Sequence, residues 1–306
     1  MIVRPKVNWL RMLFVWNGSV LQSIIPQLLF MLMLSLLALA TSGRIFGGKM
    51  LLNTAPFTLM GVSLAIFLAF RNTASYDRYL EARNAWGHLL VATRSLTSQV
   101  MCYLPQDDVG FQRKVFVGRM IAMIYALKHQ LRKTDASADL ARYLPPEELA
   151  EIQSKHYKPV ALINKLHASL GDLQRQQAIS DHTLWLCNQQ LNELSAVVGA
   201  CERITNTPIP FVYGVLLHRT VYAYCILLPF GLVDTIGIIT PLISVFVAYT
   251  LIALEAIASE IAEPFGTEPN NLALDALTRT IERSILELNG QAMPDETVAR
   301  QRFQMT

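Results

Sequence analysis

The chain has 306 residues, of which 52% are hydrophobic and only 16% are charged, and its mean hydropathy is +0.33. Soluble domains carry about 25% charged residues, so we expect part of this chain to lie in a membrane. The formal net charge of +3 is too small to favour nucleic acid as a partner. The length suffices for one membrane module and one cytosolic module with its own core.

The sequence lacks the residue spacings that are typical of catalytic or metal sites. None of the six histidines occurs in an H-x-x-x-H or H-E-x-x-H pattern, and the four cysteines include no C-x-x-C pair. There is also no glycine-rich phosphate loop and no G-x-S-x-G. We therefore expect no enzymatic activity, no cofactor, and reduced cysteines in a protein whose mass mostly faces a cytosol.

Two apolar runs in the first quarter of the chain predict membrane-spanning helices. After an N-terminal arm, residues 1–23, the first run has its apolar centre at 24–40, and it is too long for the apolar region of a cleaved signal peptide. The second run, 50–70, carries no charged residue. About 20 apolar residues suffice to cross a bilayer, so residues 24–70 are predicted to form transmembrane helices 1 and 2.

Residues 71–219 are predicted to be a cytosolic helical domain, because no further long uncharged run occurs there. Apolar residues recur at helical spacing in two stripes, and a third helix is expected to begin at the Pro145-Pro146-Glu147-Glu148 sequence. The stripes are Phe116, Met120, Met123, Leu127 and Leu131, and Leu184, Cys187, Leu191, Leu194, Val198 and Cys201.

The last third of the chain predicts two more spans and a polar end. Residues 220–254 carry a single charge, Asp234, and are assigned to transmembrane helices 3 and 4 with a turn between Gly231 and Gly237. In residues 255–306 an apolar stripe runs from Leu274 to Leu288, so a C-terminal helix ending at Gly290 is expected, followed by a tail whose last residues are predicted to be disordered. The positive-inside rule places both termini and the 71–219 domain in the cytoplasm.

The second predicted span carries two stripes at i, i+4 spacing. Val62, Ile66 and Phe70 form a bulky stripe, and Gly61, Ala65 and Ala69 form a small one, which favours close helix packing. On periodicity alone, the favoured interpretation of the bulky stripe is contact with lipid or a neighbouring helix. The alternative is a hydrophobic constriction of a pore made by several subunits. The dense charges that follow directly from Arg71 favour this alternative, since a lipid anchor rarely needs them.

The charged continuation of this helix also has ordinary interpretations. Arg78 and Glu81, at i, i+3, fit surface pairing on a helix. Tyr76, Tyr79 and Trp86 fit aromatic residues at a membrane interface. From the residues alone, these interpretations are favoured.

Four sequence blocks, in order, resemble the bestrophin family of ion channels, specifically its bacterial YneE-like branch of voltage-dependent anion channel-forming proteins. They are similar to the family's W-x-G-S, S-Y-x-R-W-x-E-x-R-x-x-W, I-P-x-V-Y and P-F-G motifs, with Tyr79 where tryptophan is usual. The matching residues are Trp16, Gly18 and Ser19; Tyr76, Arg78, Glu81, Arg83 and Trp86; Ile209, Pro210, Val212 and Tyr213; and Pro264, Phe265 and Gly266.

The resemblance implies an all-α, multi-pass membrane protein that forms a pentameric ring around a central pore. Each subunit would contribute four transmembrane helices and a cytosolic helical domain. The family's pore neck falls on Val62, Ile66 and Phe70, with Gly61, Ala65 and Ala69 as the face where helices pack around it. Its cytosolic aperture falls on Ile179. An open alternative for Ile179 is a hydrophobic staple with Leu184, with Ser180 as the N-cap.

One departure from the animal members concerns calcium. Where they follow P-F-G with a run of acidic residues, this chain has Thr267-Glu268-Pro269-Asn270-Asn271. One carboxylate offers too few charged oxygen ligands for tight calcium binding. We therefore expect no metal site and no calcium gating of the animal type.

The function that follows from the resemblance is a homopentameric channel of the bacterial inner membrane that passes small monovalent ions passively. Its partners would be further copies of itself, the lipid bilayer and the permeating ions. Anion conduction is the family default, and cation (sodium) selectivity is an alternative, because the neck carries no charge and selectivity must come from elsewhere, such as Arg44 and Lys49. The competing hypothesis is a membrane-anchored helical scaffold or sensor without permeation.

Overall fold

The computed structural model describes the chain except residues 1–7, 17, 46–47, 50–53, 109–110 and 297–306. The described residues are almost entirely helical and divide into two compact units. We call Leu80–Thr207 together with the described residues from Pro264 onward the bundle unit, and the described residues up to Tyr79 together with Pro208–Glu263 the apolar-helix unit. The predicted all-α fold is confirmed.

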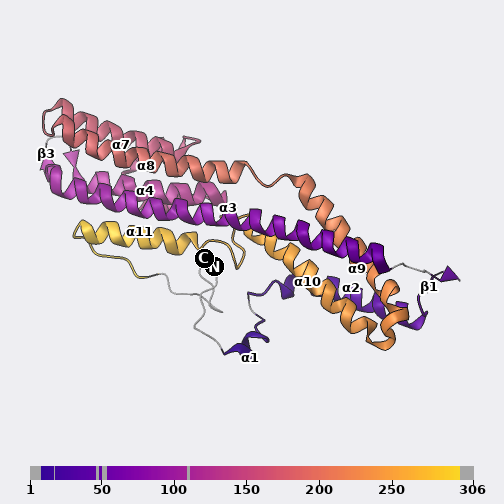
Figure 1. The fold of residues 1–306 in the computed structure, drawn as a ribbon. Coiled ribbons are helices and arrows are strands. Elements are labelled where there is room, and N and C mark those ends of the chain that lie inside the picture. Colours follow the sequence, from indigo (N-terminus) through magenta and orange to yellow (C-terminus); the bar gives the residue numbers. More distant parts are fainter. Residues whose placement is uncertain (1–7, 17, 46–47, 50–53, 109–110, 297–306) are drawn as a thin grey trace. The chain divides into compact units, whose positions relative to one another are not determined.

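The apolar-helix unit contains α1 (Trp9–Met12), α2 (Leu21–Ala40), the first part of α3 (Thr54–Tyr103), α9 (Phe211–Ile236) and α10 (Thr240–Ile261). Helices α2, α9 and α10 pack against one another (Figure 1). Ten buried residues form their common core with α3: Ile24, Met31, Leu64, Leu68, Leu217, Val221, Cys225, Ala248, Ile252 and Ala253.

Three segments of the described chain are long and apolar enough to cross a membrane: Leu21–Ala40, Ala55–Tyr103 and Phe211–Ile261. The third is interrupted by the single 3-10 turn η1 (Gly237–Ile239), where Gly237 has a φ of +52°. Glycine adopts such positive φ values more readily than other residues, so the chain reverses here. The turn therefore lies at the end of the predicted Gly231–Gly237 segment, and Gly231 and Asp234 belong to α9.

Helix α3 is a single helix of 50 residues and continues through Gly87. At about 1.5 Å per residue it measures about 75 Å, whereas the hydrocarbon core of a bilayer is about 30 Å thick. Its first part is therefore long enough to cross a membrane, and a comparable length remains beyond it. A short hairpin of β1 (Arg44–Ile45) and β2 (Gly48–Lys49) precedes the helix and pairs Arg44 with Lys49.

The bundle unit comprises the second part of α3, α4 (Arg113–Arg132), α5 (Ser137–Leu140), α6 (Pro146–Gln153), α7 (Lys158–Arg175), α8 (Asp181–Asn206) and α11 (Leu274–Leu288). A hairpin of two short strands, β3 (Asp107–Asp108) and β4 (Phe111–Gln112), leads into α4. Helix α4 packs against α7, α8 and α11. All five residues of its predicted stripe are buried, as are Cys187, Leu191, Leu194, Val198 and Cys201 of α8.

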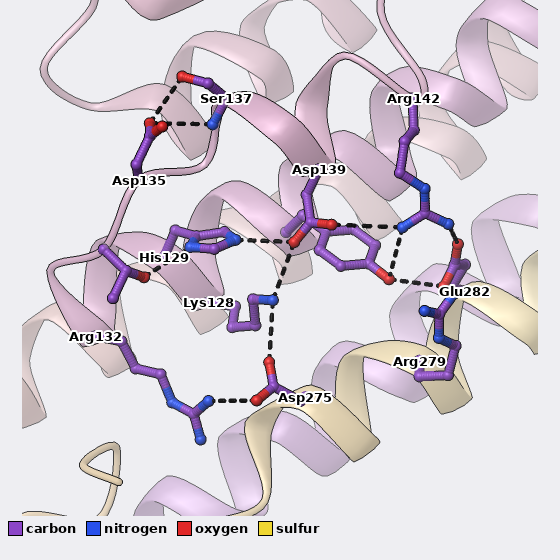
Figure 2. A network of polar contacts seen from close by, with 12 residues as sticks. Lys128, His129, Arg132, Asp135, Ser137, Asp139, Arg142, Asp275, Arg279 and Glu282 are labelled. Carbon is purple, nitrogen blue, oxygen red and sulfur yellow. Dashed lines mark hydrogen bonds and ion pairs between the residues drawn. The ribbon is translucent and has the colours of Figure 1, made fainter. Parts of the chain in front are cut away.

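Polar contacts attach the C-terminal helix α11 to α4 and the segment around α5 (Figure 2). Lys128 Nζ lies 3.1 Å from both Asp139 Oδ2 and Asp275 Oδ1, and Arg132 adds a 2.7 Å contact to Asp275. The carboxylate of Glu282, which is fully buried, accepts hydrogen bonds from Tyr125, Tyr143, Arg142 and Arg279. A buried carboxylate with this many donors is satisfied rather than reactive, so this network holds the bundle together.

Two predicted helix ends agree with the structure. Helix α6 begins at Pro146, with Glu147 and Glu148 in its first turn. Gly290, at a φ of +66°, follows α11, and the Gln291 amide donates to the Leu286 carbonyl 2.9 Å away. This is the glycine-dependent helix ending expected from the sequence. The tail predicted to be disordered begins near residue 297 and lies outside the described residues.

Candidate functional site

The bulky stripe of α3 lies on the face of the helix that its own chain leaves uncovered. Val62, Ile66 and Phe70 are 54%, 50% and 69% exposed. Leu64 and Leu68, by contrast, are buried in the core of the apolar-helix unit. Successive helical residues are about 100° apart, so Ile66 lies about 200° from both buried leucines, on the opposite side of the helix. One side of α3 thus packs within its own chain, and the opposite side is left uncovered.

The small stripe lies on the flank between these two faces. Gly61 has a role within the chain, because a Cβ atom there would lie 2.8 Å from the Tyr224 hydroxyl of α9. Phe57 packs on the same tyrosine, with ring centroids 5.2 Å apart. Ala65 and Ala69 are exposed. The packing of these alanines against other subunits remains a prediction.

The arginine of the signature block, Arg78, caps another helix. Its Nε atom donates a 2.7 Å hydrogen bond to the carbonyl of Ala262, the residue that caps the C-terminus of α10. The last carbonyls of a helix have no partner within the helix and carry partial negative charge. A guanidinium is suited to this position, so Arg78 ties α3 to the end of α10.

The other signature residues of α3 differ in their surroundings. Glu81 forms an ion pair with Arg203 of α8. Trp86 is only 2% exposed and is a core residue of the bundle unit, whereas Tyr76 is 56% exposed. Arg83 is also exposed. Glu81 thus connects α3 to α8.

The remaining blocks are structural at their positions. Pro210 is the N-cap of α9, and Pro264 and Phe265 are buried at the start of the C-terminal segment. The Leu272 amide donates to the Pro264 carbonyl across this turn, and Gly266 is half-buried within it. Gly18 has a φ of +82°, and Trp16 is 52% exposed. These residues shape the segments that enter and leave the apolar helices.

Ile179 lies directly before α8 and is 8% exposed. Ser180 is the N-cap of that helix, and its hydroxyl accepts a 3.1 Å hydrogen bond from the Thr183 amide. This is the capping geometry that a hydrophobic staple accompanies. Burial within a single chain favours the staple, and the assignment of Ile179 as an aperture stays a prediction.

The segment from Thr267 to Asn271 has few groups that suit calcium. Its one carboxylate, Glu268, is exposed, and its backbone carbonyl accepts from the Asn271 amide. Within the part of the chain that the structure describes, no group of three or more His, Cys, Asp or Glu residues is placed to hold a metal ion. Since Ca²⁺ prefers several charged oxygens, these residues do not fit the ion.

Sequence reasoning missed a polar cluster within the apolar-helix unit. Arg71 of α3 donates to Ser259 Oγ at 2.7 Å, and its Nη1 lies 3.6 Å from Glu255 Oε1, both on α10. His218 Nδ1 of α9 lies 3.0 Å from the same Glu255 oxygen. The sequence does mark two of these residues, because Arg71 and Glu255 are each the first charged residue after a long apolar run. The partners, however, are far apart in the chain.

The fold and these contacts define an all-helical protein with apolar helices long enough to cross a membrane, the second of them carrying an exposed apolar stripe. The sequence model of the family described as Bacterial/Fungal Bestrophin protein matches residues 1–287. The chain belongs to the bestrophin family, which confirms the resemblance drawn from the four sequence blocks.

Relatives of known name cover the whole chain. It is 44% identical over 301 residues to a voltage-dependent anion channel-forming protein of Ralstonia nicotianae, covering 98% of both chains. It is 41% identical over 309 residues to the voltage-dependent anion channel-forming protein YneE of Escherichia coli K12, covering 100% of both. Among solved structures, a single-residue variant of a bacterial bestrophin homolog from Klebsiella pneumoniae matches with a TM-score of 0.84 at 41% identity, over 88% of this chain and 99% of that one.

Proposed function

We propose that this protein is a homopentameric anion channel of the bacterial inner membrane, with a pore lined by α3. The observation that carries the proposal is the exposed stripe of Val62, Ile66 and Phe70, opposite the face that α3 buries in its own subunit. A stripe free of charge on that face suits a ring of helices around an axis, where apolar side chains would narrow the pore and gate it by dewetting. Membership of the bestrophin family and the names of the relatives support a channel rather than an enzyme.

In this proposal each subunit crosses the membrane four times, through α2, the first part of α3, α9 and α10. The corresponding membrane segments are residues 24–70 and 220–254. The cytoplasm would contain both termini, the arm at 1–23, the domain at 71–219 and the C-terminal residues 255–306. Ile179 would form a second constriction at the cytosolic mouth. Gly61, Ala65 and Ala69 would let neighbouring helices approach around the neck.

Selectivity for anions cannot come from the neck itself, because Coulomb attraction needs a charge there. The register of the β1–β2 hairpin pairs Arg44 with Lys49, so two basic residues occupy one short connection between α2 and α3. Basic residues at a pore entrance raise the local concentration of small monovalent anions. Replacing both with glutamine should shift the reversal potential under a salt gradient towards that of a non-selective pore. A reversal potential of the unmodified protein that indicates selectivity for cations would overturn the anion assignment.

The central experiment changes Val62, Ile66 and Phe70 together to alanine and measures currents in planar bilayers. Loss of bulk and apolarity at the constriction should raise conductance several-fold. The control changes Phe67, which is exposed and lies about 100° from Ile66 around the same helix, to alanine and should leave conductance unchanged. Native mass spectrometry of each variant would establish that the pentamer persists. Equal currents from intact pentamers with and without the stripe would refute the neck assignment, and a monomer that passes no ions would favour an anchored scaffold instead.

A further inference from the structure

A cleft of about 460 Å³ opens within the apolar-helix unit. Its lining comes from α3, from the start of α9 with the segment before it, and from the end of α10, and includes Arg71, Phe211, Arg219, Glu255, Ser259 and Glu263. Volumes of about 300–1,000 Å³ are typical of small-molecule sites. The cleft is therefore large enough for a headgroup, and none of the roles described above accounts for it.

The charges that line the cleft mark a depth in the membrane. Arg71 is the first charged residue after the apolar run of α3, and Glu255 is the first after the apolar run of α10. On α9, Arg219 is the last charged residue before the apolar run that begins at Thr220. Three helices thus change from apolar to charged at one cleft. Such a change marks the boundary between hydrocarbon and headgroups.

The cationic side of the cleft has unused hydrogen-bonding capacity. Arg71 donates from Nη2 to Ser259, and its Nη1 forms an ion pair with Glu255 at 3.6 Å but makes no hydrogen bond. Arg219 is exposed at the rim, and within the described residues no ion pair of this structure includes it. Guanidinium groups are well suited to a phosphate, which offers several strong acceptors.

The cleft also carries acid groups, Glu255 and the exposed Glu263. Two acids opposite two arginines give the cleft little net charge. A ligand that carries only an anionic group would therefore match the cleft poorly. A ligand that carries a phosphate and an ammonium group a few bonds apart matches both sides.

We propose that this cleft binds the headgroup of a zwitterionic phospholipid with a primary amine, phosphatidylethanolamine, with its phosphate at Arg71 and Arg219 and its ammonium at Glu255 and Glu263. Gly214 leaves room for it, because a Cβ atom there would lie 3.9 Å from Arg71 Nη2 and any longer side chain would enter the cleft. The inference rests on the membrane insertion that is part of the proposed function, but not on ion permeation.

The test is lipid binding by the full-length protein, delipidated in detergent and titrated with phosphatidylethanolamine, phosphatidylcholine and phosphatidylglycerol of identical acyl chains, with native mass spectrometry as the readout. We expect phosphatidylethanolamine to bind about tenfold more tightly than the other two. Arg219→Gln and Gly214→Leu should abolish this preference. Arg83→Gln, an exposed arginine outside the cleft, is the matched control and should keep it. Glu263→Gln should move the preference towards phosphatidylglycerol, since one acid is removed.

Equal retention of the three lipids, or the same lipid profile in Gly214→Leu as in the unmodified protein, would overturn the inference, and so would a folded oligomer that retains no lipid. Tightest binding of phosphatidylglycerol by the unmodified protein would contradict the pairing of charges. A protein that conducts ions without this lipid preference contradicts only the lipid site. A protein that keeps the preference but passes no ions contradicts only the channel.

Discussion

Arg78 reaches from α3 to the carbonyl of Ala262, 2.7 Å from its Nε atom, and so satisfies the C-terminal end of α10. This bond joins positions 184 residues apart in the chain. It gives the signature arginine a physical role that does not depend on ions.

Removing this arginine should therefore loosen α10 rather than alter permeation directly. Hydrogen bonds to charged groups contribute about 1.5–3 kcal/mol, so Arg78→Gln should lower the free energy of unfolding by roughly this amount. Thermal unfolding in detergent would measure the effect. Arg83→Gln, at an exposed arginine of the same helix, is the control and should change stability little. Equal stability of the two variants would contradict the capping role.

Trp86 is expected to be a packing residue and not an interfacial aromatic. It is 2% exposed, and truncation of a buried tryptophan to alanine costs about 3–5 kcal/mol. Trp86→Ala should thus unfold the bundle unit at markedly lower temperature, as followed by circular dichroism. Trp185→Ala, at a tryptophan that is 55% exposed, should have a small effect. Similar melting of both variants would refute the assignment.

The attachment of α11 should weaken in acid. Burial alone would raise the pKa of Asp139 and of Asp275. Hydrogen bonds and positive charge outweigh this effect, from Lys128 and His129 at Asp139 and from Lys128 and Arg132 at Asp275. Both pKa values therefore lie below the usual range. Because they are lower in the folded than in the unfolded chain, this stabilisation is present above about pH 4 and is lost as the pH falls through the lowered values.

Hydrogen exchange of α11 at pH 7 and at pH 3 would measure the loss, with rates corrected for the intrinsic effect of pH. Asp275→Asn should already exchange faster at pH 7 and show a smaller change between the two pH values. Asp172→Asn is the control, because the side chain of Asp172 is 58% exposed and pairs only within α7. An unchanged pH response in Asp275→Asn would show that this carboxylate does not attach the helix.

The cysteines should differ sharply in reactivity. Cys102 is exposed, whereas Cys187 and Cys201 are buried, and burial raises the pKa of Cys187 to about 11 and that of Cys201 to about 12. Since the thiolate is the reactive form, a maleimide at pH 7 should label Cys102 at least a hundredfold faster in the folded protein. Peptide mass spectrometry would check this, with Cys102→Ser as the control. Rapid labelling of Cys187 without unfolding would contradict the prediction.

Local features of the fold were predictable from the sequence because they depend on neighbours in the chain. The helix start at Pro146, the buried stripe of α8 and the ending at Gly290 each follow from residues within a few turns. The turn between α9 and α10 was placed only approximately. Gly231 and Gly237 both permit a turn, but α9 continues through Gly231 and ends at Ile236.

The site was predictable only in part, since its contacts join distant segments. Nothing in the local pattern pairs Arg78 with Ala262 or Arg71 with Glu255. The stripe of Val62, Ile66 and Phe70 was visible as a periodicity, but whether it faces its own core, lipid or a pore depends on packing. The structure removes the first of these possibilities, because the three side chains are exposed.

The exposure of Cys102 near the end of α3 has a practical consequence. If it is the one thiol that reacts in the folded protein, each subunit accepts a single dye at a defined position without any engineered residue. Single molecules labelled to completion would then lose their fluorescence in discrete bleaching steps, one for every copy of the chain. The native protein thus carries its own means of counting the subunits in one assembly.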